Sequence, residues 1–358
     1  MKCIKIAHCM VSLSGGVGSV IFNYFDQFNL DDYEVHIITQ NLVSKDYEKL
    51  YTGRGYKIHV VPSKKEGIIK NISALKKIMD EEHFDIVHCH MSITNLFPLF
   101  AAKASGVKVR INHSHLSLDL NFIERCTVRI SKLFSTDLFA CGQDAGTKLF
   151  ENSKFILLRN AINLDQYMYS FEERDRQRAY MKIGTNTTLY CHVGRFTQQK
   201  NHSFLLDIFE KIWNIDSDSK LMLIGDGELF DEIKDKAANY ICKDNILFLG
   251  MISDVNKKLQ AADVFILPSR KEGLCVAAIE AQAAGIPCVL SSNVDQTTAV
   301  NDNVVFVTSN DAEVWAQKCL ECSKMERIKD TTNLKKSGFD IIIESKKLDM
   351  FYKKAVQR

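Results

Sequence analysis

The sequence contains no long apolar run and no marked excess of charge. No uninterrupted apolar stretch approaches the roughly 18 residues that a membrane-spanning helix needs, so none is expected. The formal net charge is only +2, which gives no reason to expect nucleic acid as the main partner. The opening residues, MKCIKIAHCMVSL, form too short an apolar run for a signal sequence and are expected to form a strand.

The cysteines lack the spacing of a disulfide framework. There are eleven, an odd number, scattered through segments with strand and helix patterns. This distribution indicates reduced thiols and a cytoplasmic location. Cys319 and Cys322 have the spacing of one metal-binding pair, but they lie in a helical pattern without a second pair, so core packing is the preferred interpretation.

The chain is long enough for two domains, each with its own core. It has 358 residues, 46% of them apolar, and short apolar strand candidates alternate with helical patterns in two series. The first series begins at Ile4–His8 and the second at Leu189–Val193, with a break near 160–188. Nearly continuous apolar strands suit parallel sheets that are covered on both faces. The sequence therefore predicts an α/β fold of two Rossmann-like, doubly wound domains, residues 1–165 and 166–339.

Glycines follow the first predicted strand, in the segment from Ser14 to Gly18. A glycine such as Gly16 lets the backbone approach a phosphate, whose charge a helix N-terminus favours. The dinucleotide-binding pattern G-x-G-x-x-G is a poor fit, because Ile21 stands where the third glycine is expected. A tight turn without a ligand is the other alternative.

Two cations follow the first strand of the second series, in the segment GRFTQQKN. Arg195 and Lys200 are five residues apart, and both are expected to be exposed and to converge on one diphosphate. A solvated basic turn is the alternative interpretation.

The most specific segment runs from Pro268 to Ala281. An acidic residue, Glu272, and Gly273 precede an apolar helix that carries a second carboxylate, Glu280. A glutamate among alanine and isoleucine is costly to bury unpaired, so Glu280 needs a partner such as the two hydroxyls of a ribose. The alternative is a helix cap with an incidental second glutamate.

Here the sequence resembles a known family. Glu272 and Glu280 reproduce the E-x7-E motif of the retaining GT-B glycosyltransferases of family 4. The segments GRF–QQKN, GDGE, ILFLG and ADVFILPS match the family pattern, as do the GG loop, DIVHCH and RINHSH in the first half. Gly18 departs from it, since a glutamate is frequent there. The ending SGFDIIIESKKLDMFY is similar to the last helix of polysaccharide-assembly members, which implies that about 340–358 packs back on the first domain.

The resemblance implies a role for each matched residue. Arg195 and Lys200 would hold the diphosphate of a nucleotide-sugar donor, helped by backbone N–H groups of Gly16, Gly273, Leu274 and Cys275. Glu280 would hold the ribose and Glu272 the transferred sugar. Met251 and Ile252 would border the base.

The resemblance also implies a reaction: hexosyl transfer with retention, in a cleft between the domains, without a metal or cofactor. The donor would be a nucleotide-diphosphate sugar, UDP-linked by preference, and the acceptor a saccharide, free or on a polyprenyl diphosphate in exopolysaccharide assembly. A sugar-nucleotide epimerase and a non-catalytic nucleotide-sugar-binding protein remain alternatives.

Histidines end two predicted strands, in the sequences HCH and HSH. His113 is the preferred catalytic histidine by resemblance, with His115 as the alternative, while His88 and His90 are interpreted as cleft-wall or core residues. Four imidazoles at neighbouring strand ends could also bind zinc, a less favoured interpretation.

Basic residues gather on two helical segments of the first half. Lysines cluster between Lys64 and Lys77, and Arg125, Arg129 and Lys132 lie on one side of the predicted helix Phe122–Phe134. Such surfaces can contact anionic lipid headgroups at the inner face of the cell membrane. The alternative is a solvated charged face.

Overall fold

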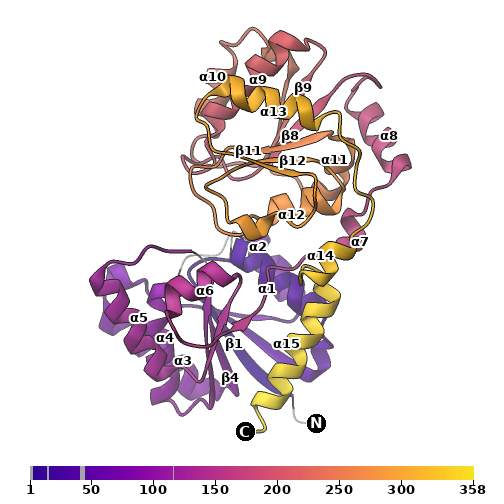
Figure 1. The fold of residues 1–358 in the computed structure, drawn as a ribbon. Coiled ribbons are helices and arrows are strands. Elements are labelled where there is room, and N and C mark those ends of the chain that lie inside the picture. Colours follow the sequence, from indigo (N-terminus) through magenta and orange to yellow (C-terminus); the bar gives the residue numbers. More distant parts are fainter. Residues whose placement is uncertain (1–2, 14–15, 41–44, 116) are drawn as a thin grey trace. The chain divides into compact units, whose positions relative to one another are not determined.

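The computed structural model describes residues 3–13, 16–40, 45–115 and 117–358. The chain divides into two compact units (Figure 1). Unit 1 comprises Met1–Ile162 and Asp340–Arg358, and unit 2 comprises Asn163–Phe339. The end of the chain thus belongs to the unit in which the chain begins.

Unit 1 is built on a seven-stranded parallel sheet. Its strands, in chain order, are β1 (Ile4–Met10), β2 (Tyr33–Thr39), β3 (Lys57–Val60), β4 (Ile86–Cys89), β5 (Val109–Ser114), β6 (Asp137–Ala140) and β7 (Ile156–Leu157). Their order across the sheet is β3-β2-β1-β4-β5-β6-β7. Every neighbouring pair is parallel, as expected for strands connected by helices.

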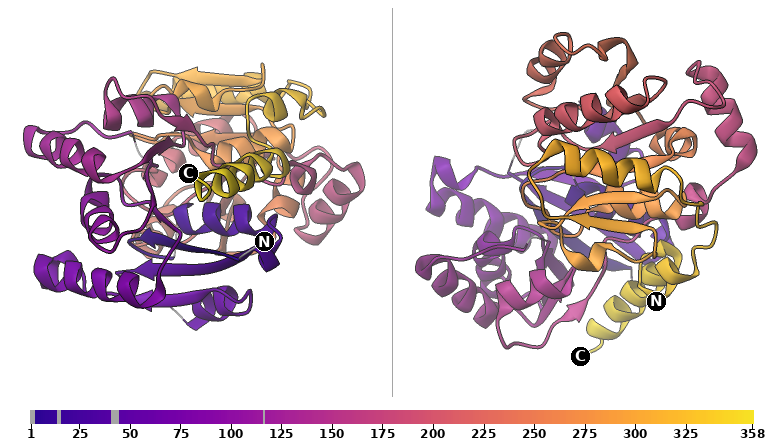
Figure 2. Two further views of the ribbon diagram at one scale, coloured as in Figure 1. Left: turned by 90° about the horizontal axis from the view of Figure 1, so that it is seen from below. Right: turned by 45° about the horizontal axis from the view of Figure 1, so that its top comes forward.

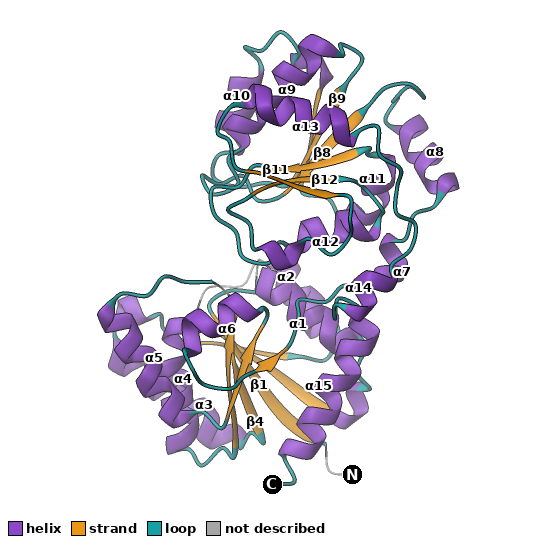
Figure 3. Ribbon diagram, viewed as in Figure 1, coloured by secondary structure: helices purple, strands orange, loops and turns teal. Residues whose placement is uncertain are grey.

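Helices cover both faces of this sheet (Figure 3). They are α1 (Gly16–Asp26), α2 (Lys45–Thr52), α3 (Ile68–Glu82), α4 (Leu96–Ala104), α5 (Phe122–Phe134), α6 (Gln143–Phe150) and α15 (Ile341–Ala355). Alternate residues of β1 enter two different cores: Ile6 joins residues of α1 and α15, whereas Cys9 joins residues of α3 and α4. This alternation explains why the strand is apolar at nearly every position.

The last helix, α15, completes one of the two cores that β1 enters, the one on the side of the sheet that α1 covers, which we call the first core. Its residues Leu348, Tyr352 and Ala355 are buried in the cluster that contains β1 and α1. The helix itself lies beside α1 (Figure 2). The Tyr33 hydroxyl donates a hydrogen bond to an Asp349 carboxylate oxygen over 2.7 Å. Residues more than 300 positions apart in the chain therefore share one core.

Unit 2 contains a six-stranded parallel sheet. Its strands are β8 (Leu189–Val193), β9 (Lys220–Ile224), β10 (Ile246–Gly250), β11 (Val264–Leu267), β12 (Cys288–Ser291) and β13 (Val304–Val307), in the order β10-β9-β8-β11-β12-β13. Its helices are α7 (Leu164–Tyr167), α8 (Phe171–Tyr180), α9 (His202–Ile215), α10 (Phe230–Ala237), α11 (Val255–Ala261), α12 (Val276–Ala283), α13 (Ala312–Cys322) and α14 (Thr332–Lys336). Short 3-10 helices occur in both units: in unit 1 at Leu30–Asp32, Lys64–Glu66 and Ser92–Asn95, and in unit 2 at Lys243–Asn245 and Gln296–Thr298.

The predicted α/β fold with two doubly wound parallel sheets is confirmed. Two details differ from the sequence analysis. Strand β13 was not predicted, although its sequence VVFV is apolar; it is an edge strand that pairs with β12, and three of its four residues are half-buried. The segment 160–188, expected as a break, contains α7 and α8. Among the described residues, no helix is both long enough and apolar enough to cross a bilayer.

Candidate functional site

Strand order marks a point in each sheet where a ligand can bind. In unit 1 the strand order reverses at β1, because β2 lies on one side of this strand and β4 on the other. In unit 2 the order reverses at β8, which lies between β9 and β11. In doubly wound sheets, ligands bind beyond the carboxyl ends of the strands at such a point. The segments after β8 and β11 contain GRFTQQKN and the first glutamate of the E-x7-E motif.

Glycines pack the loop after β8 closely against the loop after β9. A Cβ atom on Gly225 would lie 2.1 Å from the Gly194 carbonyl oxygen, and one on Gly227 would lie 2.6 Å from that of Phe196. The Phe196 N–H donates to the Asp226 carbonyl over 3.0 Å. Because φ is +135° at Gly225 and +159° at Gly227, this close approach requires glycine. The loop that carries Arg195 and Lys200 is thereby held in place.

Lys200 forms an ion pair with Glu272. Its Nζ lies 2.8 Å from Glu272 Oε2, and the two side chains are only 15% and 16% exposed. Its side chain passes Gly194, where a Cβ would lie 3.3 Å from it. Burial disfavours the charged form, but Cys275 and Glu272 raise the pKa of Lys200 above its usual value, so it stays cationic. The two residues assigned to diphosphate and sugar thus contact each other.

Arg195 occupies a different environment. Its side chain is 74% exposed, and its guanidinium lies 3.4 Å from a Glu228 carboxylate oxygen. The expectation that both cations are exposed is therefore wrong for Lys200, because the Gly194 backbone leaves room for the lysine to turn inward. Arg195 is the cation that solvent reaches.

The segment before α12 presents free backbone donors. Glu272 is fixed by its own backbone, since its N–H donates to the Asn293 carbonyl and its carbonyl accepts from the Asp295 N–H, both over 3.1 Å. Within residues 163–339, all of which the structure describes, the N–H groups of Gly273, Leu274 and Cys275 donate to no acceptor. Free donors at a helix N-terminus favour an anion.

Glu280 has a protein partner that the sequence analysis missed. The Tyr167 hydroxyl donates to Glu280 Oε1 over 2.8 Å. Burial raises the pKa of Glu280 to about 7, and the bond from Tyr167 opposes this shift. Tyr167 belongs to α7, in the segment expected as a break, and lies 113 positions away, so no local pattern indicated the pair.

The predicted base-binding residues follow β10. The strand ends at Gly250, where φ is +66°. Beyond it, the Met251 side chain is 77% exposed, whereas Ile252 packs against a core of unit 2. An exposed thioether beside an anchored isoleucine offers an apolar surface to a flat ring.

The glycine segment after β1 is only partly described. Ser14 and Gly15 lie outside the described residues, and Gly16 is the first residue of α1. A Cβ on Gly18 would lie 2.1 Å from the Leu13 carbonyl oxygen. This chain therefore has no space for the glutamate that is frequent at this position in the resembled family.

Five histidines gather at the carboxyl ends of β1, β4 and β5. They are His8, His88, His90, His113 and His115, and all are buried. The rings of His88 and His90 are 4.2 Å apart and those of His113 and His115 are 4.0 Å apart, so each pair lies on one side of its strand. Four of the five are evident in the sequence as the pairs HCH and HSH, whereas His8 was missed because it stands alone in β1.

Hydrogen bonds join these imidazoles in two rows. In one row, His8 Nδ1 lies 2.9 Å from His90 Nε2, and His90 Nδ1 lies 2.8 Å from His115 Nε2. In the other, His88 Nε2 lies 3.0 Å from His113 Nδ1. Burial lowers the pKa of His8 to about 3 and that of His115 to about 4, so both are neutral near pH 7.

The histidine nitrogens are close enough to hold a metal ion in two combinations. His8, His88 and His90 form one set, and His90, His113 and His115 form the other, each with its nitrogens within 4.8 Å of one another. Every N···N hydrogen bond, however, engages one lone pair that a metal would require. A metal would therefore have to replace those bonds.

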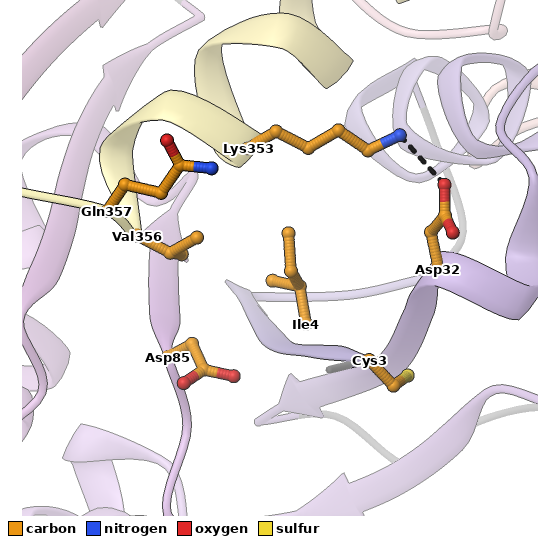
Figure 4. Close-up of a pocket in the computed structure, with 7 residues that line it drawn as sticks. All are labelled: Cys3, Ile4, Asp32, Asp85, Lys353, Val356 and Gln357. Atoms are coloured by element: carbon orange, nitrogen blue, oxygen red, sulfur yellow. Dashed lines mark hydrogen bonds and ion pairs between the residues drawn. The ribbon is translucent and has the colours of Figure 1, made fainter. Parts of the chain in front are cut away.

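A cavity of about 250 Å³ lies elsewhere in unit 1 (Figure 4). Ile4, the first residue of β1, lines it together with Asp32 and Asp85, which precede β2 and β4. Lys353 of α15 reaches across it to Asp32 over 2.7 Å. This cavity is at the amino ends of the strands, away from the histidines.

Two protein-family models match the chain. "Glycosyl transferases group 1" matches residues 173–339, and "Glycosyltransferase Family 4" matches residues 14–141. The first covers the motif segments of unit 2, and the second covers unit 1 from α1 to the end of β6.

Curated relatives match over most of their length. EpsF of Bacillus subtilis (strain 168) is 28% identical over 362 residues, covering 94% of this chain and 93% of that protein. A UDP-Gal:alpha-D-GlcNAc-diphosphoundecaprenol alpha-1,3-galactosyltransferase of Escherichia coli is 27% identical, covering 81% and 79%.

Solved structures share the fold. A glycosyltransferase from Rickettsia africae ESF-5 matches with a TM-score of 0.82 and 18% identity, covering 100% of both chains. Anabaena Alr3699/HepE, solved with UDP and glucose, matches with a TM-score of 0.79 and 15% identity, covering 97% and 99%. With the two family models covering most of the chain, these matches show that it belongs to the family 4 glycosyltransferases and has the GT-B fold.

Proposed function

We propose that this glycosyltransferase transfers a hexosyl group, with retention and without a metal, from a UDP-linked sugar to a lipid-linked saccharide in polysaccharide assembly. The observation that carries the proposal is the Lys200–Glu272 ion pair beside the free N–H groups of Gly273, Leu274 and Cys275. Together they offer a cation, backbone donors and a carboxylate to a ligand that is both anionic and rich in hydroxyl groups.

Donor binding would exchange the partners of the ion pair. A diphosphate oxygen can replace Glu272 as the partner of the Lys200 ammonium group and accept bonds from the free N–H groups. Glu272 is then available to accept hydrogen bonds from sugar hydroxyls. Arg195, which solvent reaches, can leave Glu228 for the diphosphate at little cost. Glu280 would accept from the ribose hydroxyls while keeping its bond from Tyr167.

The proposed reaction breaks one bond at the anomeric carbon and forms one on the same face. The bond between that carbon and the diphosphate oxygen breaks through an oxocarbenium-like state, and the acceptor oxygen bonds to the carbon. The acceptor proton passes to the leaving phosphate oxygen. Lys200 and Arg195 stabilise the negative charge that develops there, which is the task of a divalent ion in other enzymes. His113 would donate a hydrogen bond to the sugar.

The proposed classes of donor and acceptor are taken from the name of one relative. The Escherichia coli galactosyltransferase is named for a UDP-sugar donor and a diphosphoundecaprenol-linked acceptor, and it is 27% identical to this chain. We extend both classes to this chain as part of the proposal. The acceptor side would belong to unit 1, and the carbohydrate of the acceptor stays unassigned.

Contact with a membrane is a further part of the proposal. Four apolar side chains of α5 are exposed, Phe122 by 79%, Ile123 by 75%, Leu133 by 71% and Ile130 by 45%. The opposite side of α5, with Val128, packs into the unit. A helix with its apolar side outward suits an interfacial membrane contact, where a lipid-linked acceptor would be located.

A labelled-donor experiment tests the proposal against its alternatives. Purified protein is incubated with radiolabelled UDP-glucose, UDP-galactose or UDP-N-acetylglucosamine and an undecaprenyl-diphosphate saccharide, with and without EDTA. Transfer of label in EDTA, with retained anomeric configuration, is expected. An epimerised sugar nucleotide would establish the epimerase, and binding without turnover would establish a binding protein. Loss of transfer in EDTA, restored only by a divalent ion, would contradict metal independence.

A further inference from the structure

Tyr352, in the last helix of the chain, contacts the buried histidines at the carboxyl end of the sheet. Its hydroxyl lies 2.7 Å from His88 Nδ1, and His88 Nε2 lies 3.0 Å from His113 Nδ1. All three residues belong to unit 1 and are at most 1% exposed. They therefore form one hydrogen-bonded row that starts in α15, crosses β4 and ends in β5.

The direction of the hydrogen bonds in this row follows from the tyrosine. Among the described residues, the Tyr352 hydroxyl has no hydrogen-bond partner besides His88. If it accepted from His88, the unpaired proton would be that of Tyr352, inside the core that β1, α1 and α15 form. If it donates, the unpaired proton is on His113 Nε2, at the carboxyl end of β5, where a ligand can supply the acceptor that a buried donor requires. The hydroxyl therefore donates to His88 Nδ1. A neutral imidazole carries one N–H, so His88 must be protonated at Nε2 and must donate to His113 Nδ1.

The same rule then determines the proton position in His113. With Nδ1 accepting from His88, His113 carries its proton on Nε2. This nitrogen is buried and has no hydrogen-bond partner in the described part of the chain. A buried N–H without an acceptor indicates a site that an oxygen atom of a ligand completes.

We propose that Tyr352 is a positioning residue that acts through His88 to keep His113 in the Nε2–H tautomer, as a hydrogen-bond donor to an oxygen of the bound substrate. This inference rests on the proposed function for the identity of that oxygen, a hydroxyl of the transferred sugar. The tautomer itself is a property of unit 1. A residue of the last helix thereby determines what a strand-end histidine can do.

Nitrogen NMR tests the tautomer without any substrate. Protein labelled with ¹⁵N-histidine is recorded by long-range ¹H–¹⁵N correlation, which distinguishes Nε2–H from Nδ1–H, and His88→Asn and His113→Asn spectra provide assignments. In the wild type, both residues are expected as Nε2–H. Tyr352→Phe keeps the ring but removes the hydroxyl that fixes the direction of the hydrogen bonds. The opposite direction, with Nδ1–H on both histidines, should then also be populated, so both residues should show mixed tautomers.

Tyr33→Phe is the matched control, because it removes one hydroxyl that donates to Asp349 in the same helix. It should leave both tautomers unchanged. In the transfer assay, Tyr352→Phe should lower kcat about tenfold, since one buried hydrogen bond sets the bias, and should leave the donor KM within about twofold. A purely structural effect would appear equally in both tyrosine variants.

Three outcomes would overturn the inference, and each can be told apart from failure of the proposed function. One is an Nδ1–H tautomer of His113 in the wild type, a result that does not require a stable variant. Another is unchanged tautomers in Tyr352→Phe. The third is a shift of the His88 and His113 signals upon stoichiometric zinc chloride that EDTA reverses, which would make the cluster a metal site. A protein without transferase activity would still give the expected tautomers.

Discussion

At the residue scale, Lys200 and Arg195 differ in how far water reaches them. Lys200 is 15% exposed and paired with Glu272, whereas Arg195 is 74% exposed. An exposed ion pair contributes little to stability, while removing one partner of a buried pair leaves an uncompensated charge. The two cations should therefore affect folding differently even if both bind the diphosphate.

Alanine substitution separates these two roles. Arg195→Ala and Lys200→Ala should each lower the transfer rate about 30–1000-fold, the effect of losing a preorganised charge. Arg195→Ala should leave the free energy of unfolding nearly unchanged, whereas Lys200→Ala should lower it by about 3 kcal/mol. Chemical denaturation and rate assays measure the two effects. The double variant Lys200→Met/Glu272→Gln should regain stability but not activity; wild-type turnover in either single variant would remove that residue from the site.

Glu280 should make the stability of the enzyme depend on pH. Its pKa is raised from 4.5 to about 7 in the folded state. Protonated Glu280 therefore adds to the free energy of unfolding. This contribution is fully present below about pH 4.5, the ordinary pKa of the group, and is lost as the pH rises through about 7. Glu280→Gln has no such titration, so its free energy of unfolding relative to wild type should rise by about 1–3 kcal/mol across this window.

Thermal or urea unfolding at several pH values measures this difference, with Glu232→Gln, at an exposed position of α10, as the control. Donor affinity provides a second readout, because a carboxylate accepts ribose hydroxyls better than a protonated acid does. Wild-type affinity should rise through about pH 7, and that of Glu280→Gln should be weaker and flat. A parallel pH dependence in the two proteins would show that Glu280 does not titrate there.

At the element scale, α5 is an amphipathic helix whose apolar side faces outward. The Arg129 guanidinium is engaged by Glu151, and Lys132 Nζ lies 3.0 Å from the Ser153 hydroxyl, so part of the predicted basic face is used inside the unit. The apolar side chains, rather than the charges, should therefore dominate membrane binding. In the sequence alone the charges of this helix stand out, because burial cannot be read from the pattern of one helix.

Vesicle sedimentation tests this helix. Phe122→Ser/Ile123→Ser should lower partitioning onto phosphatidylglycerol-containing vesicles by about tenfold or more, because two large side chains no longer leave water. Phe171→Ser/Ile241→Ser, which removes two exposed apolar side chains of unit 2, is the matched control and should bind as wild type does. Equal loss in both double variants would show nonspecific adsorption, and no loss in either would refute the role of α5.

At the scale of the whole molecule, unit 1 is assembled from both ends of the chain. Residues 340–358 supply α15, and unit 2 is a continuous segment between the two parts of unit 1. Leu348 is 4% exposed in the first core, whereas Met350, two residues later on the same helix, is 62% exposed. The core of unit 1 is therefore complete only when the last helix is present.

Leu348→Ala should destabilise unit 1 by about 2–5 kcal/mol through the cavity that it leaves. Hydrogen exchange followed by mass spectrometry should show faster exchange in β1, β2 and α1, with unit 2 unchanged. Met350→Ala, the matched control, should exchange like the wild type. Faster exchange confined to unit 2 would contradict this assignment of α15.

Sequence patterns predicted the fold class, most strands and helices and the segments that carry the site, although they missed β13, α7 and α8. Apolar strands followed by glycine, lysine and glutamate are local signals, and they placed Arg195, Lys200, Glu272 and Glu280 after β8 and β11. Which side chains are partners depends instead on how distant elements pack together. Lys200 with Glu272, Tyr167 with Glu280 and Tyr352 with His88 are 72, 113 and 264 positions apart. Such pairs depend on where separate elements pack, and the pattern of one element carries no information about the neighbour that will cover it.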